Sequence, residues 1–111
     1  MQVLRTAGAF TAPAAGEPRH WVEELRVGAL SIGTYSVPVG GTDTQRPHTE
    51  DEVYVVTAGR ARLVTDSGEA PVGPGSVIYV PAHERHRFVD VTEDLAVLVV
   101  FAPPEHSAAG E

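Results

Sequence analysis

Short apolar runs, separated by turn residues at regular intervals, are the feature that most constrains how this chain can fold. The runs are rich in β-branched residues, and none continues with sustained helical periodicity. We therefore expect eight or more short strands in an all-β antiparallel barrel or sandwich. The expected strands are 20–27, 29–39, 52–58, 60–65, a short segment through 72, 76–80, 88–91 and 95–101. Turns are expected at 40–41, 59, 66–69, 73–75 and 92–94.

Composition limits the size, the partners and the metal chemistry. A chain of 111 residues is expected to form a single domain, 1–111, with an N-terminal arm at 1–18 and a flexible tail at 104–111. The net charge of −7, with only 8 Lys and Arg residues, argues against nucleic acid as a partner. Because the chain has no cysteine, any metal ion must be held by nitrogen and oxygen ligands.

The apolar stretches are too short for a membrane protein. The longest one, Leu95 to Ala102, is far below the ~20 residues that a spanning helix needs. Near the N-terminus, Thr11, Pro13 and Gly16 interrupt the apolar stretch before a signal-peptide core could form. We therefore expect a cytoplasmic protein that does not bind membranes.

Two stretches bring together the residue types that bind metals. The first runs from Arg46 to Gly59 and places a histidine and three carboxylates directly before a β-branched segment. Side chains two residues apart on an extended chain point the same way, so His48 and Glu52 should face one interior. His86 follows the strand 76–80 and a turn, and it can enter the same interior. Two imidazoles and one carboxylate form a facial ligand set that suits Fe(II), with Mn(II), Ni(II) and Zn(II) also compatible.

The first stretch resembles the first motif of the cupin family. That motif is a glycine, five residues, His-x-His, three or four residues, a glutamate, six residues and a glycine. Gly40, His48, Glu52 and Gly59 occupy these places in register.

The second stretch resembles the family's second motif, which is a glycine, five residues, Pro-x-Gly, two residues, a histidine, three residues and an asparagine. Gly75, Pro81 and His86 match, with His83 at the inner glycine and Asp90 at the asparagine. The resemblance covers roughly 30–103 and implies an antiparallel double-sheet jelly-roll barrel that pairs as a homodimer.

Arg46 stands where the family usually carries the first histidine of His-x-His, which leaves the common ligand set incomplete. Three interpretations remain open. The metal is held by His48, Glu52 and His86 alone, Glu50 supplies a fourth ligand, or metal binding is lost. Arg46 itself either binds an anionic group of a substrate or is a solvated arginine that balances the charges of Glu50 and Asp51.

The residues beyond the ligands suggest a pocket for a small molecule. Tyr54 and Phe88 lie two residues after Glu52 and His86, so they should turn into the same cavity, where they either contact a substrate or fill the core. We expect a metal-binding cupin that acts on a small organic molecule, as a mononuclear metal-dependent dioxygenase or isomerase. The alternative is a non-catalytic small-molecule-binding module without metal, in which Arg46 anchors the ligand.

Overall fold

The computed structural model describes residues 1–45 and 47–108, and within them the chain forms one antiparallel sheet. Its strands are β1 (His20–Arg26), β2 (Ser31–Val37), β3 (Asp51–Thr65), β4 (Gly68–Val72), β5 (Val77–Val80) and β6 (His86–Ala102). The hydrogen-bonded order is β1-β2-β6-β3-β4, and β5 pairs with β3 outside this path. The predicted all-β antiparallel class is confirmed, although hydrogen bonding does not close the described sheet, which ends at β1 and β4. No helix in the described part of the chain is long and apolar enough to cross a membrane.

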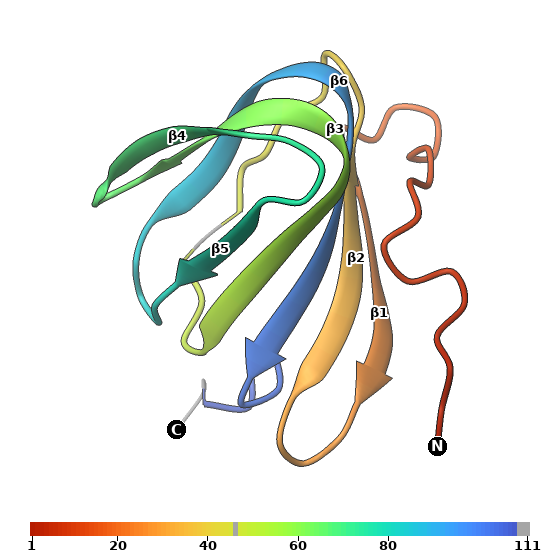
Figure 1. Cartoon of the computed structure of the whole chain (residues 1–111), viewed down its shortest axis with the longest axis vertical. Coiled ribbons are helices and arrows are strands. Elements are labelled where there is room, and N and C mark those ends of the chain that lie inside the picture. The colour runs from red at the N-terminus through yellow and green to blue at the C-terminus, as the bar shows by residue number, and fades with distance from the viewer. Residues whose placement is uncertain (46, 109–111) are drawn as a thin grey trace.

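β3 and β6 are each one long strand where the sequence pattern predicted two. β3 continues through Gly59, and β6 continues through 92–94. The register between the two strands shifts repeatedly between Val56 and Arg62, and such bulges bend and twist a strand without ending it. Figure 1 shows both strands curving strongly, so that the two ends of each strand belong to different halves of the fold. The turn residues at these positions therefore produce bends within strands, which is why fewer strands form than expected.

Gly59 makes the bend in β3 sterically possible. Its φ angle is 83°, in the left-handed region that favours glycine. A Cβ atom at this position would lie 2.1 Å from the carbonyl oxygen of Asp94 and 2.7 Å from Cα of Leu95. A side chain here would therefore push β6 away from β3 at the point where the two strands bend together.

Alternation along the two long strands directs polar and apolar side chains into the same interior. On β3, Glu52, Tyr54 and Val56 are buried and alternate with more exposed neighbours. On β6, His86 and Phe88 follow the same alternation. The core cluster contains Tyr35, Val37, Tyr54, Val56, Ala61, Leu63, Val72, Val80, Phe88, Leu95, Val97, Val99 and Phe101. Two predicted metal ligands thus lie on the core side of the sheet.

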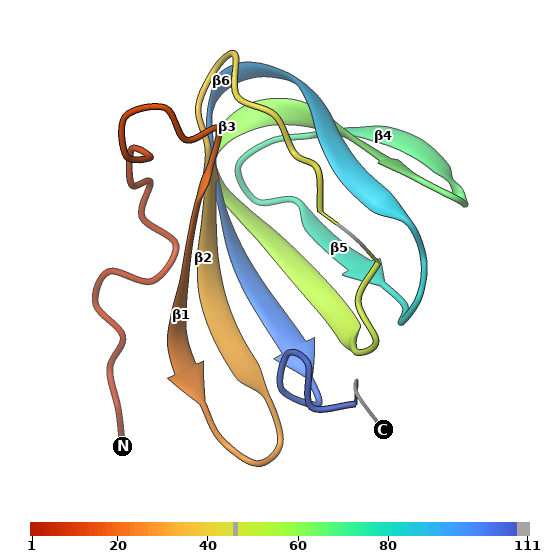
Figure 2. The same cartoon turned by 180° about the vertical axis from the view of Figure 1, so that it is seen from behind.

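Segments outside the sheet are held by hydrogen bonds to it. In the N-terminal arm, the amide of Gly8 donates to Oγ1 of Thr34 at 2.8 Å, and the amide of Thr11 donates to Oγ of Ser36 at 3.0 Å. The arm therefore lies against β2 of its own chain. Figure 2 shows residues 38–45, the first part of the connection between β2 and β3, nearer to the viewer than β5. The assignment of 1–111 to a single domain stays a prediction, and residues 109–111 of the expected tail lie outside the described residues.

Gly59→Ala should lower the free energy of unfolding by about 2 kcal/mol or more, because a left-handed conformation costs an L-residue roughly 1–2 kcal/mol and the clash with Asp94 adds to that cost. Urea denaturation measures the change. Gly16→Ala is the matched control, since Gly16 has a φ angle of 87° but nothing lies within 4 Å of the position that its Cβ atom would take. Equal losses in the two variants would contradict the packing explanation.

Candidate metal centre and cavity

Three structural elements bring the predicted ligands together. Glu52 is the second residue of β3, His86 is the first residue of β6, and His48 lies in the connection just before β3. The amide of His83 donates to the carbonyl oxygen of His48 at 2.7 Å, which ties this connection to the turn before β6. The two sequence stretches that carry the ligands are therefore joined by a backbone hydrogen bond beside the site.

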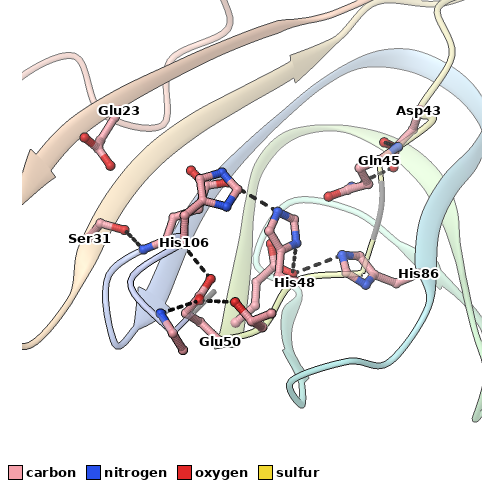
Figure 3. A network of polar contacts seen from close by, with 12 residues as sticks. Glu23, Ser31, Asp43, Gln45, His48, Glu50, His86 and His106 are labelled. Carbon is pink, nitrogen blue, oxygen red and sulfur yellow. Dashed lines mark hydrogen bonds and ion pairs between the residues drawn. The ribbon is translucent and has the colours of Figure 1, made fainter. Parts of the chain in front are cut away.

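The ligand atoms of these residues converge on one point. One nitrogen of each histidine and one carboxylate oxygen of Glu52 all lie within 4.8 Å of one another. Glu52 Oε1 is 3.0 Å from His86 Nε2 and 3.7 Å from His48 Nδ1. All three atoms are buried, and none of them has a hydrogen-bond partner among the described residues. Figure 3 shows the His48 ring facing His86, with Gln45 nearby.

Contacts on the outer side of each imidazole direct its other nitrogen towards the centre. Nδ1 of His86 lies 2.8 Å from the carbonyl oxygen of Glu84, so Nδ1 donates and Nε2 keeps a free lone pair. Nε2 of His48 lies 3.2 Å from Oε2 of Glu105, which leaves Nδ1 facing Glu52. Burial lowers the pKa of His86, but the nearby Glu52 carboxylate and the Glu84 carbonyl outweigh burial, and the net pKa is raised.

The donor atoms fit a first-row divalent metal ion. A buried polar atom without a partner costs roughly 1–3 kcal/mol, and here three such atoms share one small space. Two imidazole nitrogens and one carboxylate oxygen are the donor set of facial-triad sites. A cation among them would satisfy all three atoms at once, which no protein group in the described chain does.

Glu50, the candidate fourth ligand, does not belong to this cluster. Its carboxylate accepts hydrogen bonds from the amides of His106 at 2.8 Å and Ala108 at 3.1 Å, and from the hydroxyl of Thr49. Burial raises the pKa of Glu50, but these hydrogen bonds outweigh burial and the net pKa is lowered. The chain is not extended at Thr49 and Glu50, so the alternation that sequence spacing assumed begins only with β3. Glu50 holds the C-terminal segment, residues 103–108, against the site (Figure 3).

A cavity of about 210 Å³ opens beside the converging atoms. Its wall is largely aromatic and includes His48, Glu52, Trp21, Tyr35, Tyr54 and Phe101. Tyr54, a predicted substrate contact, therefore lines the cavity. Phe88, the second predicted contact, is not part of the wall and instead packs on Tyr54 with ring centroids 5.0 Å apart. Arg46, the third, lies outside the described residues.

Sequence reasoning missed several residues of the cavity, because they meet only through long-range contacts. Arg19, Gln45 and Glu105 line it, and they come from the segment before β1, the β2–β3 connection and the C-terminal segment. Asp43 supports the wall from behind. Its carboxylate accepts from the Tyr35 hydroxyl at 2.7 Å, the Phe88 amide at 2.7 Å and Nε2 of Gln45 at 2.9 Å. No local motif marks any of these residues.

Comparison with known proteins agrees with this architecture. The cupin domain model matches residues 33–101, which is more than half of the chain. An uncharacterized protein of Streptomyces coelicolor is 47% identical over 85 residues, which cover 77% of this chain and 81% of that protein. The chain belongs to the cupin domain family.

Solved cupin-like structures share the fold. KdgF from a Halomonas species superposes with a TM-score of 0.72 and 18% identity, covering 82% of this chain and 85% of that one. An RmlC-like cupin with a double-stranded β-helix fold from Methanocaldococcus jannaschii superposes with a TM-score of 0.69 and 15% identity. The match covers 86% of this chain and 89% of that one. The DMSP lyase DddQ from Ruegeria pomeroyi superposes with a TM-score of 0.72 and 15% identity. The match covers 92% of this chain and 54% of the lyase chain. At such low identity, these structures establish the fold alone.

The contact between His48 and Glu105 predicts that neutral, metal-free His48 carries its proton on Nε2. Two-bond 1H–15N correlation spectra in alkaline buffer distinguish this tautomer from the Nδ1–H form. Glu105→Ala should increase the Nδ1–H population, whereas Glu93→Ala, which removes an exposed carboxylate paired with Arg60, should leave His48 unchanged. An Nδ1–H tautomer in the wild type would show that Glu105 does not orient this ring.

Proposed function

We propose that this protein is a metal-dependent cupin that acts on a small organic molecule. The observation that carries the proposal is the convergence of His48 Nδ1, Glu52 Oε1 and His86 Nε2, all buried and without hydrogen-bond partners among the described residues. These three side chains would hold one divalent ion at the wall of the aromatic cavity. Three protein ligands leave coordination positions open, so a molecule in the cavity could reach the ion.

The chain's own residues have separable roles in this proposal. His48, Glu52 and His86 bind the ion, while the Glu84 carbonyl and the Glu105 carboxylate orient the two imidazoles. Tyr35 and Tyr54 remain protonated phenols, because burial raises the pKa of both. The nearby Asp43 carboxylate raises the pKa of Tyr35 further, and the Glu52 carboxylate does the same for Tyr54. The aromatic side chains give the cavity apolar walls, and polar contacts beside such walls are stronger than in bulk water.

Fe(II) is the favoured ion, with Mn(II), Ni(II) and Zn(II) compatible with the same donors. A bound ion of this kind supplies Lewis-acid polarisation of a substrate oxygen, and a redox-active one also supplies oxygen chemistry. Oxygen insertion by a dioxygenase, or isomerisation, are the reaction classes that this donor set supports. Oxygen uptake by the metal-loaded protein with substrate separates them, because an isomerase consumes no oxygen.

Elemental analysis of purified protein, loaded in turn with Fe(II), Mn(II), Ni(II) and Zn(II), tests the metal site. We expect about one ion per chain in the wild type. His48→Ala and His86→Ala should lose the ion, because each removes one of three protein ligands. His83→Asn is the matched control, since it removes an exposed histidine and asparagine tolerates the φ angle of 70° at that position.

Glu50→Gln distinguishes the three-ligand site from a four-ligand site. We expect this variant to keep its metal, because Glu50 binds backbone amides and not the converging atoms. If Glu50→Gln loses metal as completely as His86→Ala, Glu50 is a ligand. If the wild type takes up none of the four ions, the protein is instead a small-molecule-binding module without metal.

We also propose a cytoplasmic homodimer that forms through the outer face of β5. Val77 and Tyr79 are 67% and 60% exposed on this strand, and a second copy of the chain would cover them. Light scattering should give about twice the chain mass of 11.8 kDa. Tyr79→Glu should produce a monomer, whereas Val39→Glu, at a 56% exposed valine elsewhere, should not. A monomeric wild type at high concentration would contradict the dimer. The cytoplasmic location is a separate proposal, which cell fractionation tests.

A further inference from the structure

The cavity contains a cation that the proposed metal site does not use. Arg19 lines the wall together with the aromatic side chains, although it lies just outside β1. Nη1 of Arg19 donates to Oγ1 of Thr44 at 2.9 Å, and this is its single side-chain hydrogen bond within the described residues. No ion pair joins Arg19 to a carboxylate in residues 1–45 and 47–108, although Glu52 and Glu105 line the same cavity. Most of its five N–H donors are therefore available to a ligand.

Backbone packing brings the segment that carries this arginine close to the β2–β3 connection. A Cβ atom at Gly41 would lie 2.5 Å from the carbonyl oxygen of Pro18 and 2.9 Å from that of Pro38. Only a residue without a side chain lets the β2–β3 connection approach the segment before β1 so closely. The hydrogen bond from Arg19 to Thr44 joins the same two segments. Burial and then the Asp43 carboxylate raise the pKa of Tyr35. The charge of the Arg19 guanidinium partly opposes them and lowers this pKa, so Arg19 lies close enough to act on Tyr35.

We infer that the cavity takes a small monocarboxylate, whose carboxylate is bound by Arg19 and whose apolar body lies among the aromatic rings. The inference rests on the proposed function, because the same cavity is bounded by the proposed metal ligands. A guanidinium binds a carboxylate through two parallel hydrogen bonds, and its pairing does not require the metal. Trp21, Tyr35 and Phe101 supply flat apolar surface, with Trp21 edge-to-face against Tyr35 at 6.4 Å and against Phe101 at 6.2 Å.

Charge and size select a monocarboxylate over other ligands. Three carboxylates lie at or behind the wall, those of Glu52, Glu105 and Asp43, so Arg19 and a divalent ion are the two groups in the cavity that attract an anion. Those carboxylates disfavour a dianionic phosphate beside a single arginine. The volume of about 210 Å³ is below the ~300–1,000 Å³ typical of drug-sized pockets, so the ligand must be small. A cationic ligand would be repelled by both Arg19 and the ion.

Matched probes of equal shape and different charge test the inference. Benzoate and butanoate are the acids, benzamide and butanamide are their neutral isosteres, and benzylammonium is the cation. Calorimetry with metal-loaded wild-type protein should show at least one acid binding about tenfold or more tightly than its amide, because hydrogen bonds to charged groups are the strong ones. Equal binding of acids and amides, no binding of either acid, or preferential binding of benzylammonium would each overturn the inference.

Variants separate this inference from the proposed metal site. Arg19→Gln should reduce acid binding to the level of the amide while keeping about one metal ion per chain. Arg19→Lys should bind acids with intermediate affinity, since it keeps the charge and loses the two-point contact. Arg5→Gln removes an exposed arginine and should change neither measurement. Unchanged acid binding in Arg19→Gln overturns the inference alone. Arginine-dependent acid binding by a wild-type protein that takes up no metal would support the inference and refute the metal proposal.

Discussion

The candidate site is built around a buried carboxylate, Glu52, one oxygen of which lacks a hydrogen-bond partner among the described residues. Glu52 is 2% exposed, and its Oε1 atom lies near two imidazole nitrogens that also lack partners among the described residues. Burying a polar atom without a partner costs roughly 1–3 kcal/mol, and protonation of His86 offsets this cost only for the pair that it forms with Glu52, at the expense of its metal-binding lone pair. A bound cation would contact all three atoms at once, including His48 Nδ1, which the pair of His86 and Glu52 leaves without a partner.

The bent strands explain how the cluster forms in so small a protein. β3 and β6 each pass through both halves of the fold, so Glu52 near the start of β3 and His86 at the start of β6 point into one interior. The outer contact of His86 is local, from the Glu84 carbonyl just before it, whereas the outer contact of His48 comes from the distant Glu105 carboxylate. The C-terminal segment that carries Glu105 is held in turn by Glu50. A segment far along the chain therefore fixes the orientation of His48.

Local sequence pattern predicted the parts of the site that depend on local geometry. Two-residue alternation on β3 and the spacing after Pro81 placed Glu52 and His86 on the core side, and His48 lies beside them. The pattern predicted separate strands around Gly59 because a glycine signals a reversal as readily as a bulge, and only its packing against β6 distinguishes them. Glu105, Asp43 and Arg19 were not predicted, since each reaches the site through long-range contacts. The side chain of Glu50 departs from the alternation because the chain is not extended before β3.

The most direct measurement is a crystal structure of the protein reconstituted with Ni(II) or Zn(II), with anomalous scattering collected at the metal absorption edge. We expect one strong anomalous peak per chain, bound by His48, Glu52 and His86, with Glu50 still on the amides of His106 and Ala108. A map with no peak between these three side chains, or with metal only at exposed histidines such as His83, would contradict the central claim that their convergence is a metal centre.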